Sequence, residues 1–215
     1  GTGVNLLSMM NIKSASGSLT LTNGKIITGV NELVIANTTP GSCSAGNVNS
    51  FVSGNLRRSL LATGNYNFPL GNATKGYQLA TINFTSPTLI GNLLGRFDSW
   101  PSTPPIVGGS DCSNNYTLAA EDNGYWTITA DANPTSGSYT ATLYPIGATN
   151  TAAASAWTIM KAPNLAGVWA FDGTCGTGVA GTVSRTGMKG FSVFAAAQGV
   201  SSSLPLQLLS FSGEK

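Results

Sequence analysis

Few side chains of this chain could carry out chemistry, and histidine is absent from all 215 residues. General acid–base catalysis most often uses His, Asp or Glu. Without histidine, neither a Ser-His-Asp triad nor a Cys-His pair can form. The candidates that are left are eight carboxylates, namely Glu32, Asp98, Asp111, Glu121, Asp122, Asp131, Asp172 and Glu214.

These acids also fit an ordinary structural role. A glycosidase pair could be drawn from Asp98, Glu121, Asp122 and Asp172, because glycoside hydrolysis needs two carboxyl groups. The segments Glu121-Asp122-Asn123-Gly124 and Asp172-Gly173 are, however, typical of turns in which acids cap the backbone. We therefore predict that the chain is not an enzyme.

The sequence predicts no cofactor and no zinc site, because it has no C-x-x-C pair and no imidazole. Carboxylate and amide oxygens suit calcium. Asp111, the run Glu121 to Asn123, and Asp172 are the positions at which calcium could bind. None of them has EF-hand spacing, so calcium is a minor hypothesis.

The three cysteines are Cys43, Cys112 and Cys175. In an oxidising compartment they would allow one disulfide and one free thiol. The preferred pair is Cys112 with Cys175, because both lie in loop-like sequence, GGSDCSNN and DGTCGTG. The alternative, three buried free thiols, stays open.

Aromatic and basic residues are a second, weaker set of candidate ligand-binding residues. Arg96 and Trp100 loosely resemble a group that stacks on a sugar. The four tryptophans are more typical of core positions, since each buries a large apolar area. Arg57 and Arg58 are adjacent, so in a strand they face opposite sides. We expect one of them to be solvated and the other to pair with an acid such as Asp98.

The composition excludes several classes of partner. Charged residues make up 8% of the chain, with 10 basic against 8 acidic side chains, and nucleic-acid binding needs clustered Lys and Arg. Apolar residues make up 41% but occur in short runs, so we predict no membrane insertion. Such a charge-poor, Ser-, Thr- and Gly-rich chain is typical of secreted and cell-surface β proteins.

Short strands separated by turn residues predict an all-β fold, a β-sandwich. At the N-terminus the apolar runs 6–12, 19–22 and 33–36 fit either a short β-solenoid-like segment or a meander. The strands 124–130 and 138–144 are predicted to form a hairpin. We divide the chain into residues 1–40, which stack on the main domain, a sandwich over 41–199, and a linker with one further strand over 200–215.

The last run of the chain reads as a strand without a partner. Residues 190–197 alternate as a half-buried strand, and 204–211 alternate again after a Ser-rich joint. We expect the second run to begin a following domain or to pair with another subunit. Its interface residues would be Leu204, Leu206, Leu208, Leu209 and Phe211.

Several motifs resemble a family. FSVF followed by LPLQLLSF, and upstream GKIITGVNELVI, FVSGNLRRSL, YNFPLGN and GYWTITA, resemble β-rich modules of large Bacteroidota surface and secreted proteins that are exported by type IX secretion. The resemblance implies export, an extracellular location and a non-catalytic role in a modular polypeptide. It implies no catalytic residues.

The leading hypothesis is therefore an extracellular structural or adhesive module that contacts neighbouring domains or identical subunits and self-associates by strand exchange. The alternative is a carbohydrate-binding module of a secreted polysaccharide-degrading protein, with surface glycans as its partners.

Overall fold

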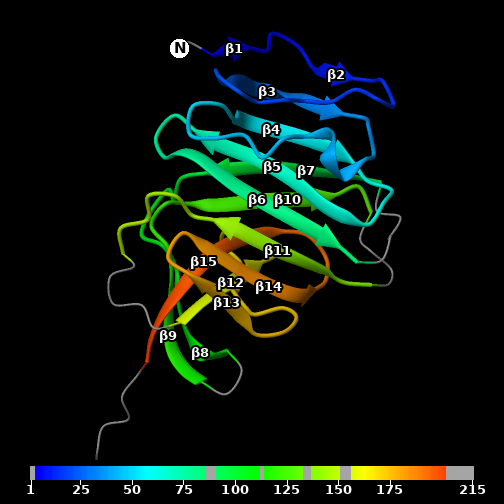
Figure 1. Cartoon of the computed structure of the whole chain (residues 1–215). Helices are drawn as coiled ribbons and strands as arrows, with labels where there is room; N and C mark the ends of the chain where they lie inside the picture. Colours follow the sequence, from blue (N-terminus) through cyan, green and yellow to red (C-terminus); the bar gives the residue numbers. More distant parts are fainter. Residues whose placement is uncertain (1–2, 86–90, 112–113, 133–136, 151–155, 202–215) are drawn as a thin grey trace, which may run out of the picture.

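The computed structural model describes residues 3–85, 91–111, 114–132, 137–150 and 156–201. These residues form an elongated all-β protein in which a parallel stack of strands lies at one end and the β8–β9 hairpin at the other (Figure 1). The prediction of an all-β, sandwich-like fold is confirmed. The described elements are β1 (Val4–Asn5), β2 (Met10–Ile12), β3 (Ile26–Ile35), the 3-10 helix η1 (Pro40–Ser42), β4 (Val52–Ser59), β5 (Gly64–Asn72), β6 (Gly76–Phe84), β7 (Asn92–Asp98), β8 (Ile106–Asp111), β9 (Asn114–Ala120), β10 (Tyr125–Ala130), β11 (Tyr139–Tyr144), β12 (Ala156–Ala162), β13 (Gly176–Val179), β14 (Thr182–Met188) and β15 (Val193–Ser201).

The strands follow the two-residue period of a sheet that is buried on one face. In β11, for example, Tyr139, Ala141 and Leu143 are buried, while the residues between them are half-buried. β-Branched and aromatic side chains at the buried positions favour this extended conformation over helix.

The N-terminal strands form a parallel stack. β1 and β2 both pair with β3, β3 pairs with β4, and the start of β4 pairs with β5, all in parallel. Equivalent apolar residues form columns through the stack, as in Met10, Leu33 and Leu56. A parallel bridge between Leu19 and Cys43 adds a second side to the stack. The pairing runs on from β3 to β4 without a break at residue 40.

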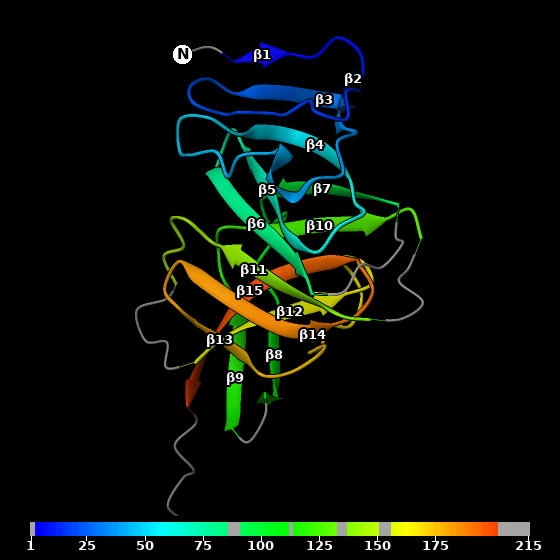
Figure 2. The ribbon, with the colours of Figure 1, turned by 45° about the vertical axis from the view of Figure 1, so that its right-hand side comes forward.

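Strand β4 is the point at which the sheet divides. One edge of β4 pairs with β3; the other pairs with β5 at Val52 and Ser53 and then with β7 from Leu56 onward. From here one branch runs β5-β6-β11-β14-β13 and the other runs β7-β10-β15-β9-β8. Figure 2 shows the two branches diverging below the stack.

Strand β15 divides in the same way. Its one edge pairs with β12, and its other edge pairs with β10 at Val193 and Phe194 and then with β9 from Ala197 onward. Phe194 is fully buried, and Phe191 stacks on Tyr139 with ring centroids 4.4 Å apart.

The main core lies between the two branches and is continuous with the interior of the stack. A smaller cluster covers the opposite face of β12 and β15, and it includes Met160, Trp169 and Ala195. The two layers and their common core define the sandwich.

Two details of the predicted layout need correction. β10 and β11 do not form a hairpin, because β10 pairs with β7 and β15 whereas β11 pairs with β6 and β14. The connection between them crosses from one branch to the other. The predicted strand 19–22 contributes only the bridge at Leu19, while β3 is a long strand that starts at Ile26.

The structure describes no part of residues 202–215, so Leu204, Leu206, Leu208, Leu209 and Phe211 lie outside the described residues. No helix long and apolar enough to cross a membrane occurs within the described ranges.

Candidate functional site

The outer end of the parallel stack is rich in exposed apolar side chains. Residues 4–25, which we call the first rung, form the last layer of the stack (Figures 1 and 2). In this rung Val4 is 63%, Leu7 96%, Met9 61% and Met10 47% exposed. Leu33 and Leu56, which lie in register with Met10 one and two layers inward, are fully buried. The first rung therefore places an apolar side chain, Met10, at the end of a buried column without a layer over it in the described structure.

The first rung is also positively charged. It contains Lys13 and Lys25 and no acidic residue. Lys25 lies over the ring of Phe51, with its Nζ 4.8 Å from the ring centroid, a cation–π contact that fixes one of the two charges.

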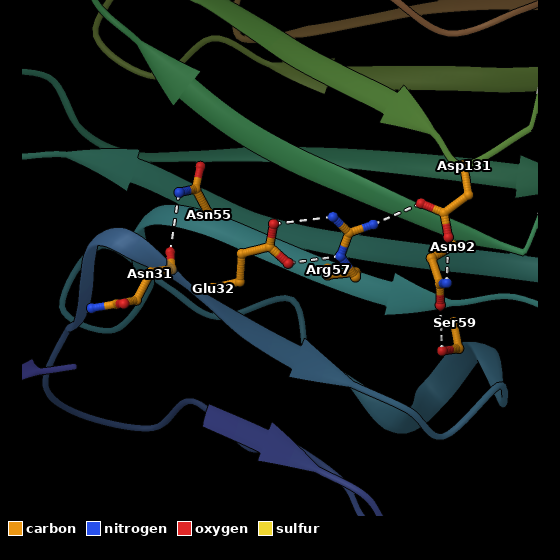
Figure 3. Close-up of polar contacts among 7 residues, drawn as sticks. All are labelled: Asn31, Glu32, Asn55, Arg57, Ser59, Asn92 and Asp131. Carbon is orange, nitrogen blue, oxygen red and sulfur yellow. Dashed lines mark hydrogen bonds and ion pairs between the residues drawn. The ribbon is translucent and has the colours of Figure 1, made fainter. Parts of the chain in front are cut away.

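A series of polar contacts joins the parallel stack to the branch that begins with β7 (Figure 3). Arg57 donates to both carboxylate oxygens of Glu32, at 2.7 and 3.0 Å, and to Asp131 at 2.8 Å. Asp131 accepts a hydrogen bond from Asn92, which accepts one from Ser59. The hydrogen bond from Arg57 lowers the pKa of Glu32 below its usual value. Since each group already has a partner, this network joins β3, β4 and β7 and offers little to a ligand.

Arg58 points to the opposite side, as the sequence predicts, but it does not pair with Asp98. Its buried guanidinium donates to the carbonyls of Asn67 and Pro40 and to Ser42 Oγ, at 2.8–3.0 Å. Burial lowers the pKa of Arg58. This side chain therefore fixes η1 against the core, and Asp98 instead binds Arg96, 2.7 Å away.

Arg96 and Trp100 do not share a site. Arg96 is half exposed and lines a hollow of about 200 Å³ beside Asn72 and Gly54. Trp100 lines a separate pocket of about 320 Å³, whose other lining residues are Pro101, Ser102, Thr103, Pro105, Leu165, Ala166 and Trp169.

The aromatic wall of this pocket is fixed from behind. The indole N–H of Trp100 donates to the carbonyl of Glu121 at 2.8 Å. Tyr125 and Trp169 lie 5.0 and 5.7 Å from Trp100 between ring centroids, at 44° and 61°. The three rings are thus not coplanar, and Trp100 and Trp169 line an apolar pocket rather than a flat platform. Trp126 is a core residue, as predicted.

The cysteines behave differently from one another. Cys43 is a buried free thiol, and burial raises its pKa to about 11. Cys175 is disulfide-bonded. Cys112, the partner expected from the sequence, lies outside the described residues, so the pairing stays a prediction.

Asp111 belongs to a buried ion pair. Arg185 Nη1 donates to its Oδ2 at 2.8 Å, and the Thr158 hydroxyl and the Gly176 N–H donate to the same oxygen. Burial acts to raise the pKa of Asp111, but the hydrogen bonds from Arg185, Thr158 and Gly176 outweigh it and lower the pKa. Asp111 is therefore occupied by structural contacts, and Asp172 likewise binds Lys161 and the N–H of Lys189.

The acidic turn after β9 is only partly as expected. Asp122 caps the turn by accepting hydrogen bonds from the N–H and hydroxyl of Thr149. Glu121 does not cap anything, because its side chain is fully buried and both of its carboxylate oxygens lack a hydrogen-bond partner in the described structure. The sequence run Glu-Asp-Asn-Gly gave no sign of this burial. The described residues contain no cluster of three or more Cys, Asp or Glu side chains that could hold a metal.

The fold and these sites define an all-β, sandwich-like protein with a parallel strand stack at one end. Comparison with protein-family models, with curated proteins and with solved structures found no match.

Proposed function

We propose that the chain is a non-catalytic structural module of an extracellular or cell-surface protein, which joins further β-structure through the open end of its stack. The observation that carries this proposal is the first rung, whose interior-type residues Val4 and Met10 are exposed. Contiguous exposed apolar residues mark interaction surfaces, and an unpaired strand edge is a template for another strand.

The extracellular location has independent support. Cys175 is disulfide-bonded, and disulfides persist mainly in oxidising compartments. The low content of charged residues, 8%, agrees with the composition of secreted β proteins. Adhesion and type IX export are parts of the proposal that rest on the sequence motifs.

The occupant that fits the first rung is a parallel β-rung of another segment, not a second copy of this chain. A parallel strand laid on β1 and β2 would continue the columns, since it would cover Met10 as β2 covers Leu33. Two copies meeting at their first rungs would instead bring Lys13 and Lys25 of both chains together, and like charges at close range repel. The partner rung is therefore neutral or acidic.

The test extends the stack within one polypeptide. A second copy of residues 4–25, with Lys13→Glu and Lys25→Glu in the added copy only, is placed before Gly1. Burying the exposed side chains is expected to raise Tm by about 3–8 °C, since each buried apolar side chain contributes about 1.5–3 kcal/mol. The amide protons of β1 and β2 should also become protected from hydrogen exchange.

The matched control carries serine at the copied positions of Val4, Leu6, Met10 and Ile12, and it should leave Tm unchanged. An added rung that leaves the β1 and β2 amides unprotected contradicts the proposal. A dimer of the unmodified chain in native mass spectrometry, lost on Met10→Lys, would contradict the choice of occupant.

A second function, binding of carbohydrate, is favoured by the pocket at Trp100. Its apolar walls and fixed indole suit the C–H face of a sugar ring. We expect Trp100→Ala to weaken binding of any oligosaccharide that binds the chain by on the order of tenfold, the loss typical of an aromatic anchor. Isothermal titration against soluble oligosaccharides measures this, with Trp157→Ala as the control outside the pocket. Equal affinities of the two variants would argue against this function.

A further inference from the structure

Glu121 lies in the interior of the sandwich, at the edge of strand β15. Its N–H donates to the carbonyl of Ala196 at 2.8 Å, so it continues the ladder between β9 and β15 beyond Ala120. Ala120 belongs to the smaller apolar cluster, and successive residues of an extended chain face opposite sides. The Glu121 side chain therefore points into the main core, where both carboxylate oxygens are buried and unpartnered in the described structure.

Gln198 brings a second unpartnered oxygen to the same face. Ala120 pairs with Ala197, so Glu121 lies opposite Ala196, and Gln198 is the diagonal neighbour on the same side. Diagonal neighbours are about 7–8 Å apart, within reach of two long side chains. The Gln198 amide nitrogen already donates to the carbonyl of Asn150, and its Oε1 is buried without a partner.

Asn123 supplies a third side chain. It is fully buried, and its amide nitrogen donates to Gln78 Oε1 of the opposite branch at 2.8 Å. That bond fixes the orientation of the amide, and its Oδ1 has no partner among the described residues. The two amides thus use their donors elsewhere, and the three side chains together have four buried acceptor oxygens without a partner in the described structure.

We propose that Glu121, Asn123 and Gln198 form a binding site for a hard cation of the calcium class. Burial of acceptors without donors is unfavourable, and a cation satisfies carboxylate and amide oxygens together. Calcium prefers such all-oxygen ligand sets, including amide carbonyls, whereas transition metals prefer nitrogen or sulfur. With a single carboxylate, the site belongs with the weak class of extracellular modules, which bind calcium at about 0.1–1 mM.

The competing state is a protonated Glu121 without a cation. Burial, with a smaller effect of the neighbouring Asp122, raises the pKa of Glu121 from 4.5 to about 8. The folded chain then binds a proton that the unfolded chain has released, so stability falls as pH rises from about 4.5 to about 8. Burial acts to raise the pKa of Asp122, but hydrogen bonds from Thr149 and the charge of Lys75 outweigh it and lower the pKa.

The experiment titrates the intact chain with CaCl₂ at pH 7.5 and follows Tm. At 10 mM calcium we expect a rise of about 3–8 °C, the mass-action effect for a site of this affinity. Terbium is the optical probe, because the Trp100 indole binds the backbone of Glu121 and can sensitise terbium luminescence.

Glu121→Gln should abolish both the calcium shift and the terbium signal. Glutamine resembles the protonated acid, so this variant is expected to fold; Gln198→Met, which leaves the carboxylate intact, should weaken calcium binding at least tenfold. Asp98→Asn, a change at the exposed Arg96 pair, is the control and should keep the full response.

Two outcomes would overturn the proposal. One is a chain whose Tm does not respond to calcium up to 10 mM, which would leave Glu121 as a buried acid that binds no cation. The other is a calcium or terbium response that survives in Glu121→Gln, which would place the cation elsewhere.

Discussion

Replacing Arg185 by alanine is expected to lower the free energy of unfolding by about 3–5 kcal/mol, as found when one partner of a buried ion pair is removed. The Arg185 side chain is 3% exposed. It donates to Asp111, to the Thr158 hydroxyl and to the carbonyl of Asp172, and it lies over the ring of Phe171. Its loss would remove the Arg185 charge from beside the buried Asp111 carboxylate.

Urea unfolding followed by tryptophan fluorescence measures this change. Arg96→Ala is the matched control, because the Arg96–Asp98 pair has the same 2.7–2.8 Å geometry but a half-exposed arginine, and it should change stability by no more than about 0.5 kcal/mol. Equal losses of unfolding free energy in the two variants would show that burial of the Arg185–Asp111 pair does not increase its contribution to stability. Since the pKa of Asp111 is lowered, the wild-type chain should lose this contribution as pH falls below the ordinary value of 3.8.

The second large effect is expected at Gly54, in the part of β4 where its neighbour changes from β5 to β7. Gly54 has φ of 121°, and a Cβ there would lie 2.2 Å from Thr28 Oγ1. That oxygen is buried and accepts a hydrogen bond from the N–H of Asn55 at 2.8 Å. Gly54→Ala should therefore cost about 2–4 kcal/mol, the sum of backbone strain and a lost hydrogen bond.

Gly29→Ala separates the effect of the Thr28 contact from the effect of the positive φ angle. Gly29 also has a positive φ, 60°, but nothing lies within 4 Å of its Cβ position, so its replacement should cost only about 1–2 kcal/mol. Denaturant unfolding of the two variants gives the comparison. A Gly54→Ala protein as stable as Gly29→Ala would mean that Thr28 moves aside freely and that the division of the sheet tolerates a side chain.

The sequence predicts the local features of this fold well. Alternating side chains and glycine turns identify β6 and β11 as strands, and the adjacency of Arg57 and Arg58 places them on opposite faces. Such features depend on neighbours along the chain, which a sequence contains explicitly.

The pairing of strands that lie far apart in the sequence was not predictable in the same way. β10 and β11 have the pattern of a hairpin, yet they pair with β7 and β6 in different branches. The burial of Glu121 depends on the approach of β15, which follows it by more than seventy residues along the chain. Neither contact leaves a local signal, because the polar run around Glu121 is also the ordinary pattern of an exposed turn.

The position of β15 has a consequence for how the protein is made. The last described strand is an interior one, and it pairs with β9, β10 and β12, so one half of the sandwich has no central strand until it emerges from the ribosome. Because a sheet with a missing interior strand cannot bury its faces, this half must stay open until β15 has been synthesised. The nascent polypeptide would therefore remain a substrate for chaperones until nearly every described residue has been translated.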